Sequence, residues 1–207
     1  NYINWKEAIK ELHKPENIGN YKKDYYKRLA FDEIFSTFLV NSEIRNNIKK
    51  IKKKNKIINR DQQNILIKKL NFDLTKDQLN ALSEINNDLS SSNKMFRLLQ
   101  GDVGSGKTII SLLSAFNTIN SGFQVAIMAP TEILARQHFN LAKKIFPKNI
   151  KTELISGKIE HKIKKNILQK LSSHQIDIIF GTHAIFQKNV AFKNLGLVII
   201  DEQHKFG

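Results

Sequence analysis

The chain contains no cysteine, and only three prolines and nine glycines occur among its 207 residues. Without cysteine it can form neither disulfides nor thiolate metal sites, and its six histidines show no metal-ligand spacing. No stretch approaches the roughly eighteen consecutive apolar residues that a membrane-spanning helix requires, and no signal peptide is visible. Internal repeats and low-complexity linkers are absent as well. These absences exclude a disulfide scaffold and lead us to expect a cytoplasmic protein.

Acidic residues are also scarce: 19 Asp and Glu stand against 34 Lys and Arg, and the formal net charge is +15. Such an excess predicts an anionic partner, because Lys and Arg that face phosphates release condensed counterions. Residues 45–60 hold eight Lys or Arg and no carboxylate, and Ile44, Ile48, Ile51 and Ile58 have near-helical spacing. We therefore expect a helix with one apolar and one basic face. Two interpretations of this segment stay open. It contacts DNA, or it is a solvated face whose lysines reflect an AT-rich genome, since 29 Ile, 29 Lys and 22 Asn in the whole chain indicate such a genome.

Residues 101–108 read GDVGSGKT and match the phosphate-binding pattern G-x-x-x-x-G-K-[ST] in full. The glycines let backbone N–H groups point at phosphate oxygens, and the following helix adds the positive end of its dipole. Lys107 is expected to reach the β- and γ-phosphates, and the Thr108 hydroxyl to ligate Mg²⁺. The predicted cofactors are therefore ATP and Mg²⁺. The expected nucleotide contacts of the loop are Gly101, Asp102, Val103, Gly104, Ser105, Gly106, Lys107 and Thr108.

A second candidate site follows the apolar run Leu197–Ile200, which stops at Asp201 and Glu202. Ligands of open α/β sheets bind at the carboxyl ends of the strands, where these two carboxylates are expected. Asp201 suits Mg²⁺ binding, and Glu202 suits a general base that orients the attacking water. Alone, such a strand end is more often merely solvated. Together with the phosphate loop it predicts a nucleotide hydrolysis site.

The chain around these motifs alternates between strand and helix patterns. We expect helices over about 109–122, 132–146 and 160–171, and strands over 96–99, 123–129, 151–155, 176–180 and 197–200. Alternation of this kind predicts a parallel sheet flanked by helices, preceded here by a helical segment with an apolar stripe from Phe31 to Leu39. The expected fold class is α/β, a RecA-like P-loop domain.

Several segments carry a more specific resemblance. They are RLLQ at 97–100, MAPTEILA at 128–135 followed by Gln137 and His138, GTHAIFQ at 181–187 and LVIIDEQHKFG at 197–207. Together they resemble the RecG family of bacterial ATP-dependent DNA helicases, in superfamily 2. LTKDQ at 74–78 is similar to the adenine-recognition segment of that family, and residues 7–15 are similar to the end of its wedge domain.

The resemblance implies roles for further residues. Gln78 would read the adenine edge, although it also suits an ordinary helix surface. Pro130, Thr131, Thr182 and His183 would contact DNA; Thr131 also suits a simple helix cap, and His183 a solvated loop. Gln203 and His204 would couple the γ-phosphate to DNA binding. The implied catalytic set is Lys107, Asp201, Glu202, Gln203 and His204.

The resemblance also implies an organisation. Residues 1–20 are expected to be a remnant of the wedge domain, in which Pro15 and Gly19 break the helix. Residues 21–70 are expected to form a helical linker that contains the basic segment. Residues 71–207 are expected to form the first RecA-like domain, truncated at its C-terminus. The second RecA-like domain of the family, which carries an arginine finger, is expected outside this chain. We therefore expect a monomeric segment of a helicase that acts on branched DNA. Two alternatives remain: a nucleotide- and DNA-binding module without turnover, and a piece of a transcription-repair coupling translocase, against which Ser105 and Gln203 argue.

Overall fold

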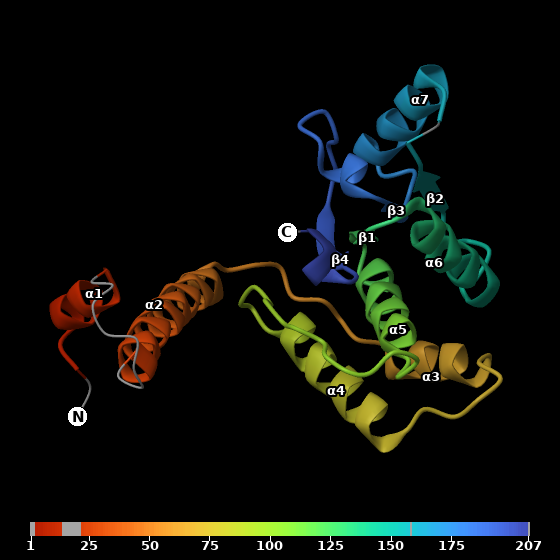
Figure 1. Cartoon of the computed structure of the whole chain (residues 1–207). Helices are drawn as coiled ribbons and strands as arrows, with labels where there is room; N and C mark the ends of the chain where they lie inside the picture. Colours follow the sequence, from red (N-terminus) through yellow and green to blue (C-terminus); the bar gives the residue numbers. More distant parts are fainter. Residues whose placement is uncertain (1–2, 14–21, 158, 207) are drawn as a thin grey trace. The chain divides into compact units, whose positions relative to one another are not determined.

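The structure is a computed structural model that describes residues 3–13, 22–157 and 159–206. The chain divides into two compact units, Asn1–Lys52 and Lys53–Gly207, which are called the first and the second unit and are described separately (Figure 1). The division falls inside the segment 21–70, so the expected domain boundaries stay a prediction. Pro15 and Gly19, the expected helix breakers, lie outside the described residues. Within the described ranges no helix is both long and apolar enough to cross a bilayer.

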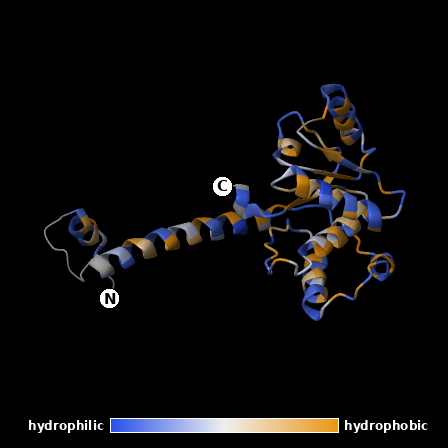
Figure 2. Cartoon of the chain, turned by 45° about the vertical axis from the view of Figure 1, so that its right-hand side comes forward, coloured by the Kyte–Doolittle hydropathy of each residue, from blue (hydrophilic) through white to orange (hydrophobic). Residues whose placement is uncertain are grey.

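The first unit consists of helix α1, Trp5–His13, against helix α2, Lys22–Lys50. Ala8 of α1 is fully buried. The apolar stripe expected along α2 is present, and Phe31 and Phe35 stack one turn apart with their ring centroids 5.6 Å from each other. Figure 2 shows apolar and polar residues alternating along the whole length of α2. Most of the stripe is exposed to solvent within this unit.

The helix expected over residues 45–60 is wrong beyond Lys50, where α2 ends. Residues 53–59, which begin the second unit, have no regular secondary structure. The backbone N–H groups of Lys53 and Lys56 donate to the carbonyls of Ser92, at 2.8 Å, and Leu89, at 3.1 Å. These long-range hydrogen bonds take the place of the i to i−4 bonds of a helix, so tertiary contacts override the local helical spacing.

A single parallel sheet forms the centre of the second unit. Its strands are β1, Gln124–Met128; β2, Thr152–Ile155; β3, Ile178–Gly181; and β4, Leu195–Ile200. They lie in the order β2-β3-β1-β4, and every neighbouring pair is parallel. The expected α/β fold class is therefore confirmed, with these four strands within two residues of their expected bounds.

Helices cover both faces of the sheet, as a parallel sheet requires (Figure 1). They are α3, Arg60–Lys68; α4, Lys76–Ser90; α5, Lys107–Asn120; α6, Glu132–Ile145; and α7, His161–Ser172, with the 3-10 turns η1, His183–Phe186, and η2, Gln203–Phe206. Val125 and Ile127 pack with α3 to α6, whereas Ala126 and Met128 pack with α7 and η1. The alternation of strand side chains thus produces two apolar cores.

The strand expected over residues 96–99 is wrong. This segment has no partner in the sheet, and Phe96 and Leu98 are exposed. Arg97 ties the segment to α4 through ion pairs with Glu84, at 2.6 Å, and Asp88, at 2.7 Å. A strand exists only where a neighbour supplies ladder hydrogen bonds, and side-chain contacts anchor this segment instead.

Gln124, fully buried at the start of β1, joins elements at the amino ends of the strands. Its side-chain nitrogen donates to the carbonyls of Leu171 and Ile176, at 2.9 and 2.8 Å. Its side-chain oxygen accepts from the N–H groups of Lys193 and Asn194, at 2.9 and 3.0 Å. One side-chain amide thereby bonds to four backbone groups and uses both its donor and its acceptor capacity.

Candidate nucleotide and DNA site

The phosphate loop depends on glycine at three positions. Gly104 and Gly106 both have φ of +82°, in the left-handed region that L side chains rarely adopt. A Cβ atom on Gly106 would also collide with the side-chain nitrogen of Gln78, and one on Gly101 would lie 2.8 Å from the Ser105 hydroxyl oxygen. The loop conformation therefore requires glycine at 104 and 106, whereas a side chain at 101 would displace the Ser105 hydroxyl. The loop leads directly into α5.

Lys107 is the first residue of α5, and its ammonium lies across the mouth of the loop. The Nζ atom donates to the carbonyls of Gly101 and Asp102, both at 2.7 Å. These contacts place a positive charge beside the backbone N–H groups of a helix start, where anions bind favourably. The proposed contact with β- and γ-phosphates requires the ammonium to exchange these carbonyls for phosphate oxygens.

Gln78 lies against the phosphate loop rather than on an open helix surface. Its side-chain oxygen accepts from the N–H of Thr75, at 2.9 Å, in the capping box that begins α4. Its side-chain nitrogen donates to the carbonyl of Ser105, also at 2.9 Å. Both halves of the amide are engaged, so recognition of adenine, which stays a prediction, would require new partners for them.

Asp201 follows β4 directly and is held through backbone and side chain. Its N–H donates to the carbonyl of Met128, at 2.8 Å, and its Oδ2 lies 2.6 Å from Nε2 of His138 on α6. The pKa of Asp201 is lowered, and the hydrogen bond from His138 contributes most to this shift. Desolvation raises the pKa in opposition. The charge of His138, the N–H of Glu202 and the charge of Lys107 lower it further. The carboxylate is therefore held in its ionised form.

His138 has a contact that sequence reasoning missed. It was named only as part of a motif, without a role of its own. Its position two helical turns after Thr131 indicated which helix it lies on, but nothing local indicated that it would meet Asp201.

The two residues expected to hold Mg²⁺, Thr108 and Asp201, line the same small hollow. Thr108, Ser111, His138 and Asp201 line this space of about 20 Å³ between α5, α6 and β4. A hydroxyl and an ionised carboxylate are ligands that Mg²⁺ prefers, so the residues present fit this ion. No group of three or more His, Cys, Asp or Glu in the described part of the chain could hold a metal ion. Mg²⁺ at this site would therefore depend on nucleotide phosphates for further ligands.

Glu202 has a backbone conformation that is unusual for a residue with a side chain. Its φ is +51°, which costs a non-glycine residue of order 1 kcal/mol and is often found at functional sites. Its carboxylate pairs with Lys205 at 2.9 Å. Gln203 begins η2 and is exposed. His204 belongs to the same turn, but its side chain lies outside the described residues.

The residues expected to contact DNA lie at the same edge of the sheet as Asp201. Thr131 caps α6, where its hydroxyl accepts from the N–H of Leu134 at 3.3 Å, and it is exposed directly after Pro130. Thr182 precedes η1 without a side-chain cap hydrogen bond, and His183 is exposed. These segments meet where β1 and β3 end. Capping by Thr131 leaves its helix start accessible, so cap and phosphate contact are compatible.

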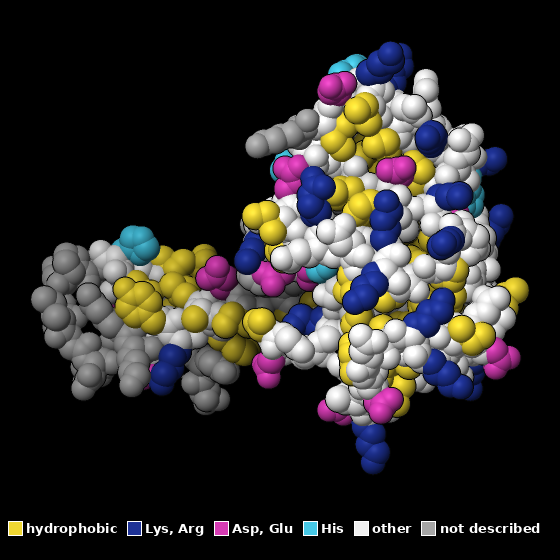
Figure 3. Space-filling model, turned by 90° about the vertical axis from the view of Figure 1, so that its right-hand side faces the viewer, with side chains coloured by type: hydrophobic (Ala, Val, Ile, Leu, Met, Phe, Trp, Pro, Cys, Tyr) yellow, Lys and Arg dark blue, Asp and Glu magenta, His cyan; other side chains and the backbone are white. Residues whose placement is uncertain are grey.

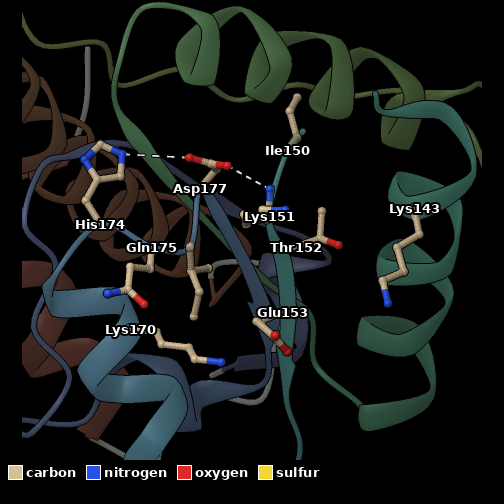
Figure 4. A pocket seen from close by; sticks show the side chains of 10 residues that line it. Lys143, Ile150, Lys151, Thr152, Glu153, Lys170, His174, Gln175 and Asp177 are labelled. Atoms are coloured by element: carbon tan, nitrogen blue, oxygen red, sulfur yellow. Dashed lines mark hydrogen bonds and ion pairs between the residues drawn. The ribbon is translucent and has the colours of Figure 1, made fainter. Parts of the chain in front are cut away.

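A larger hollow lies at the opposite edge of the sheet, at the amino ends of β2 and β3 (Figure 4). Its volume is about 630 Å³, and α6 and α7 also line it. Its Asp177 accepts from the N–H of Lys151 at 2.7 Å and lies 3.9 Å from His174. That carboxylate stabilises the turn before β3, and none of the predicted site residues lies there. We therefore place the candidate site at the carboxyl edge.

Surface charge does not locate the DNA contact by itself. On the face shown in Figure 3, Lys and Arg side chains are spread out rather than gathered in one patch. Two lysines of the basic segment 45–60 have structural contacts instead. Lys53 Nζ donates to the carbonyls of Leu89 and Ser91, at 2.7 and 2.6 Å, and Lys56 is buried. These two side chains are therefore unsuited to DNA binding.

Comparison with known proteins decides the family. The model of the DEAD/DEAH box helicases matches residues 75–207, which is more than half of the chain. The chain belongs to the DEAD/DEAH box helicase family. Curated relatives of this helicase chain carry the name ATP-dependent DNA helicase RecG. That of Streptococcus pneumoniae is 38% identical over 97% of this chain, and that of Borreliella burgdorferi is 44% identical over 97%.

A solved structure described as RecG bound to a three-way DNA junction is also similar to this helicase chain. The two are 42% identical with a TM-score of 0.79, over 98% of this chain and 28% of that one. The helicase chain likewise covers only 30% of the Streptococcus pneumoniae relative and 29% of the Borreliella burgdorferi relative. It thus spans less than a third of the length of these proteins. The expected relation to RecG helicases is confirmed.

Proposed function

We propose that this chain is the first motor segment of an ATP-dependent DNA helicase that moves branched DNA, such as Holliday junctions and stalled forks, in repair and recombination. The observation that carries the proposal is the convergence of Thr108, at the start of α5, and Asp201, after β4, on one hollow beside the phosphate loop. This is the arrangement that hydrolysis of a nucleoside triphosphate with Mg²⁺ requires.

Each residue then has a defined task. The loop N–H groups and Lys107 bind the phosphates, and Gln78 contacts the base. Thr108 and Asp201 hold Mg²⁺, which offsets charge on the phosphates when it is bound. Glu202 orients the attacking water. Gln203 and His204 link the γ-phosphate to DNA.

Branched DNA is proposed as the substrate because the similar solved structure is described as bound to a three-way junction. The DNA backbone would contact the start of α6, at Pro130 and Thr131, and the loop with Thr182 and His183. Such contacts read phosphates rather than bases, so binding should be independent of sequence and steeply dependent on salt.

Nucleotide binding tests the first half of this proposal. Titration of the 207-residue chain with a fluorescent ADP and Mg²⁺ should give saturable binding. Lys107→Ala should abolish it, because the variant loses the charge that faces the phosphates, while its circular dichroism stays unchanged. Lys54→Ala, at an exposed lysine outside the loop, is the matched control. Equal affinity in wild type and Lys107→Ala would contradict the assignment.

Hydrolysis in the whole protein tests the second half. DNA-stimulated phosphate release should occur there and should disappear in Glu202→Gln, which keeps the shape of the side chain but cannot act as a base. Nucleotide binding should survive in that variant. A whole protein that binds nucleotide and DNA but releases no phosphate would instead support the module without turnover.

A further inference from the structure

One segment of the chain holds Asp201 at two points. The Asp201 N–H bonds to Met128 at the end of β1, and its carboxylate bonds to His138 on α6, which follows β1 in the chain. An ionised carboxylate can only accept, so Nε2 of His138 is the donor. The strand therefore fixes the backbone of Asp201, and the helix fixes its side chain.

His138 is largely buried where it contacts Asp201. Its side chain is 11% exposed, and it lines the same hollow as Thr108. The distance of 2.6 Å between Nε2 and Oδ2 is at the short end for a hydrogen bond to a charged oxygen. A free carboxylate rotates about its terminal bonds, whereas this one has a fixed partner on a regular helix.

We infer that His138 is a positioning residue, which orients the Asp201 carboxylate for Mg²⁺ and thereby raises the affinity for the magnesium form of the nucleotide. The inference rests on the proposed function. His138 contacts neither nucleotide nor metal in this scheme; it acts only through Asp201. Partners of this kind typically change metal affinity 10- to 100-fold.

Two amide variants separate positioning from packing. In His138→Gln the side-chain nitrogen lies as many bonds from Cα as Nε2 of histidine, so it can still reach Asp201. In His138→Asn the nitrogen is one bond closer to the backbone and falls short. Both variants are polar amides of similar character, so each serves as the control for the other.

The measurement is the affinity of the 207-residue chain for fluorescent ADP, with Mg²⁺ and with EDTA, at one pH. The wild type should bind more tightly with Mg²⁺. With Mg²⁺ present, His138→Asn should bind the nucleotide about tenfold more weakly than wild type, and the affinity of His138→Gln should stay within about threefold of wild type. All three should bind equally in EDTA. If the Asn variant does not fold, His138→Leu, which fills the space without a donor, replaces it.

The possible outcomes distinguish the inference from the proposed function. If Mg²⁺ raises the nucleotide affinity of His138→Asn or His138→Leu as much as that of the wild type, the inference alone is overturned. An equal loss of affinity with Mg²⁺ and with EDTA would also overturn it, because that pattern indicates a merely structural side chain. Absence of nucleotide binding in the wild type would overturn both.

Discussion

Lys56 should make the stability of the second unit depend on pH. Its side chain is 4% exposed, its Nζ lies 4.7 Å from the ring centroid of Phe123, and none of the ion pairs in the described part of the chain involves it. Desolvation, followed by the positive charge of Lys53, lowers the pKa of Lys56 from 10.5 to about 8. The folded chain therefore binds this proton less tightly than the unfolded chain does.

The sign and size of the effect follow from that difference. Below about pH 8 both states are protonated, and the folded state carries the full desolvation cost. Between about pH 8 and 10.5 the folded state releases the proton first, so stability rises with pH. At about 1.4 kcal/mol for each pKa unit, the cost is of order 3 kcal/mol.

Lys56→Met keeps the volume of the stem and removes the charge. We expect it to raise the free energy of unfolding at pH 7 by roughly 2–3 kcal/mol, since some attraction to the Phe123 ring is lost. The gain should shrink as the pH rises from 8 to 10.5. Lys54→Met, at an exposed lysine of the same segment, should show neither effect.

Urea denaturation followed by circular dichroism at several pH values measures these differences. Trp5, the single tryptophan, belongs to the first unit, so circular dichroism is followed instead of tryptophan fluorescence. A difference between wild type and Lys56→Met that does not vary with pH would refute the reasoning. A less stable Lys56→Met at pH 7 would refute it as well.

Two further substitutions test the loop and the start of α6. Gly106→Ala should lower the free energy of unfolding by about 1–2 kcal/mol, because φ at Gly106 is positive, and should weaken nucleotide binding at least about tenfold. Gly157→Ala, at a glycine with open space around it, should have neither effect. Thermal melting measures the stability, and nucleotide titration measures the affinity. Thr131→Ala should lose about 1 kcal/mol of helix-capping stabilisation and should bind labelled duplex DNA more weakly in fluorescence anisotropy, whereas Thr131→Ser should keep both the cap and the affinity. Unchanged DNA affinity in the alanine variant would leave Thr131 as a helix cap only.

Local pattern was sufficient for the loop and the fold class. Phosphate binding uses the N–H groups of consecutive residues, so the eight residues 101–108 contain the whole signal. Strands buried on both faces read as continuous apolar runs, and β1 and β3 were recognisable for that reason. β4 has the same apolar composition, although Val198 and Ile200 are exposed. The carboxylates that follow β4 were predictable from the same pattern, since a parallel sheet gathers its strand ends at one edge.

Tertiary structure alone decided the features that depend on distant partners. Residues 96–99 have a strand-like composition but no neighbouring strand. The helical spacing of 45–60 gave way after Lys50 to hydrogen bonds with Leu89 of α4 and with Ser92 beyond it. The burial of Lys56 has no local signal. His138 and Asp201 lie 63 positions apart, and their contact exists only because the fold brings α6 beside the residue that follows β4. Sequence specifies local backbone geometry, whereas desolvation and side-chain hydrogen bonds depend on what the fold brings together.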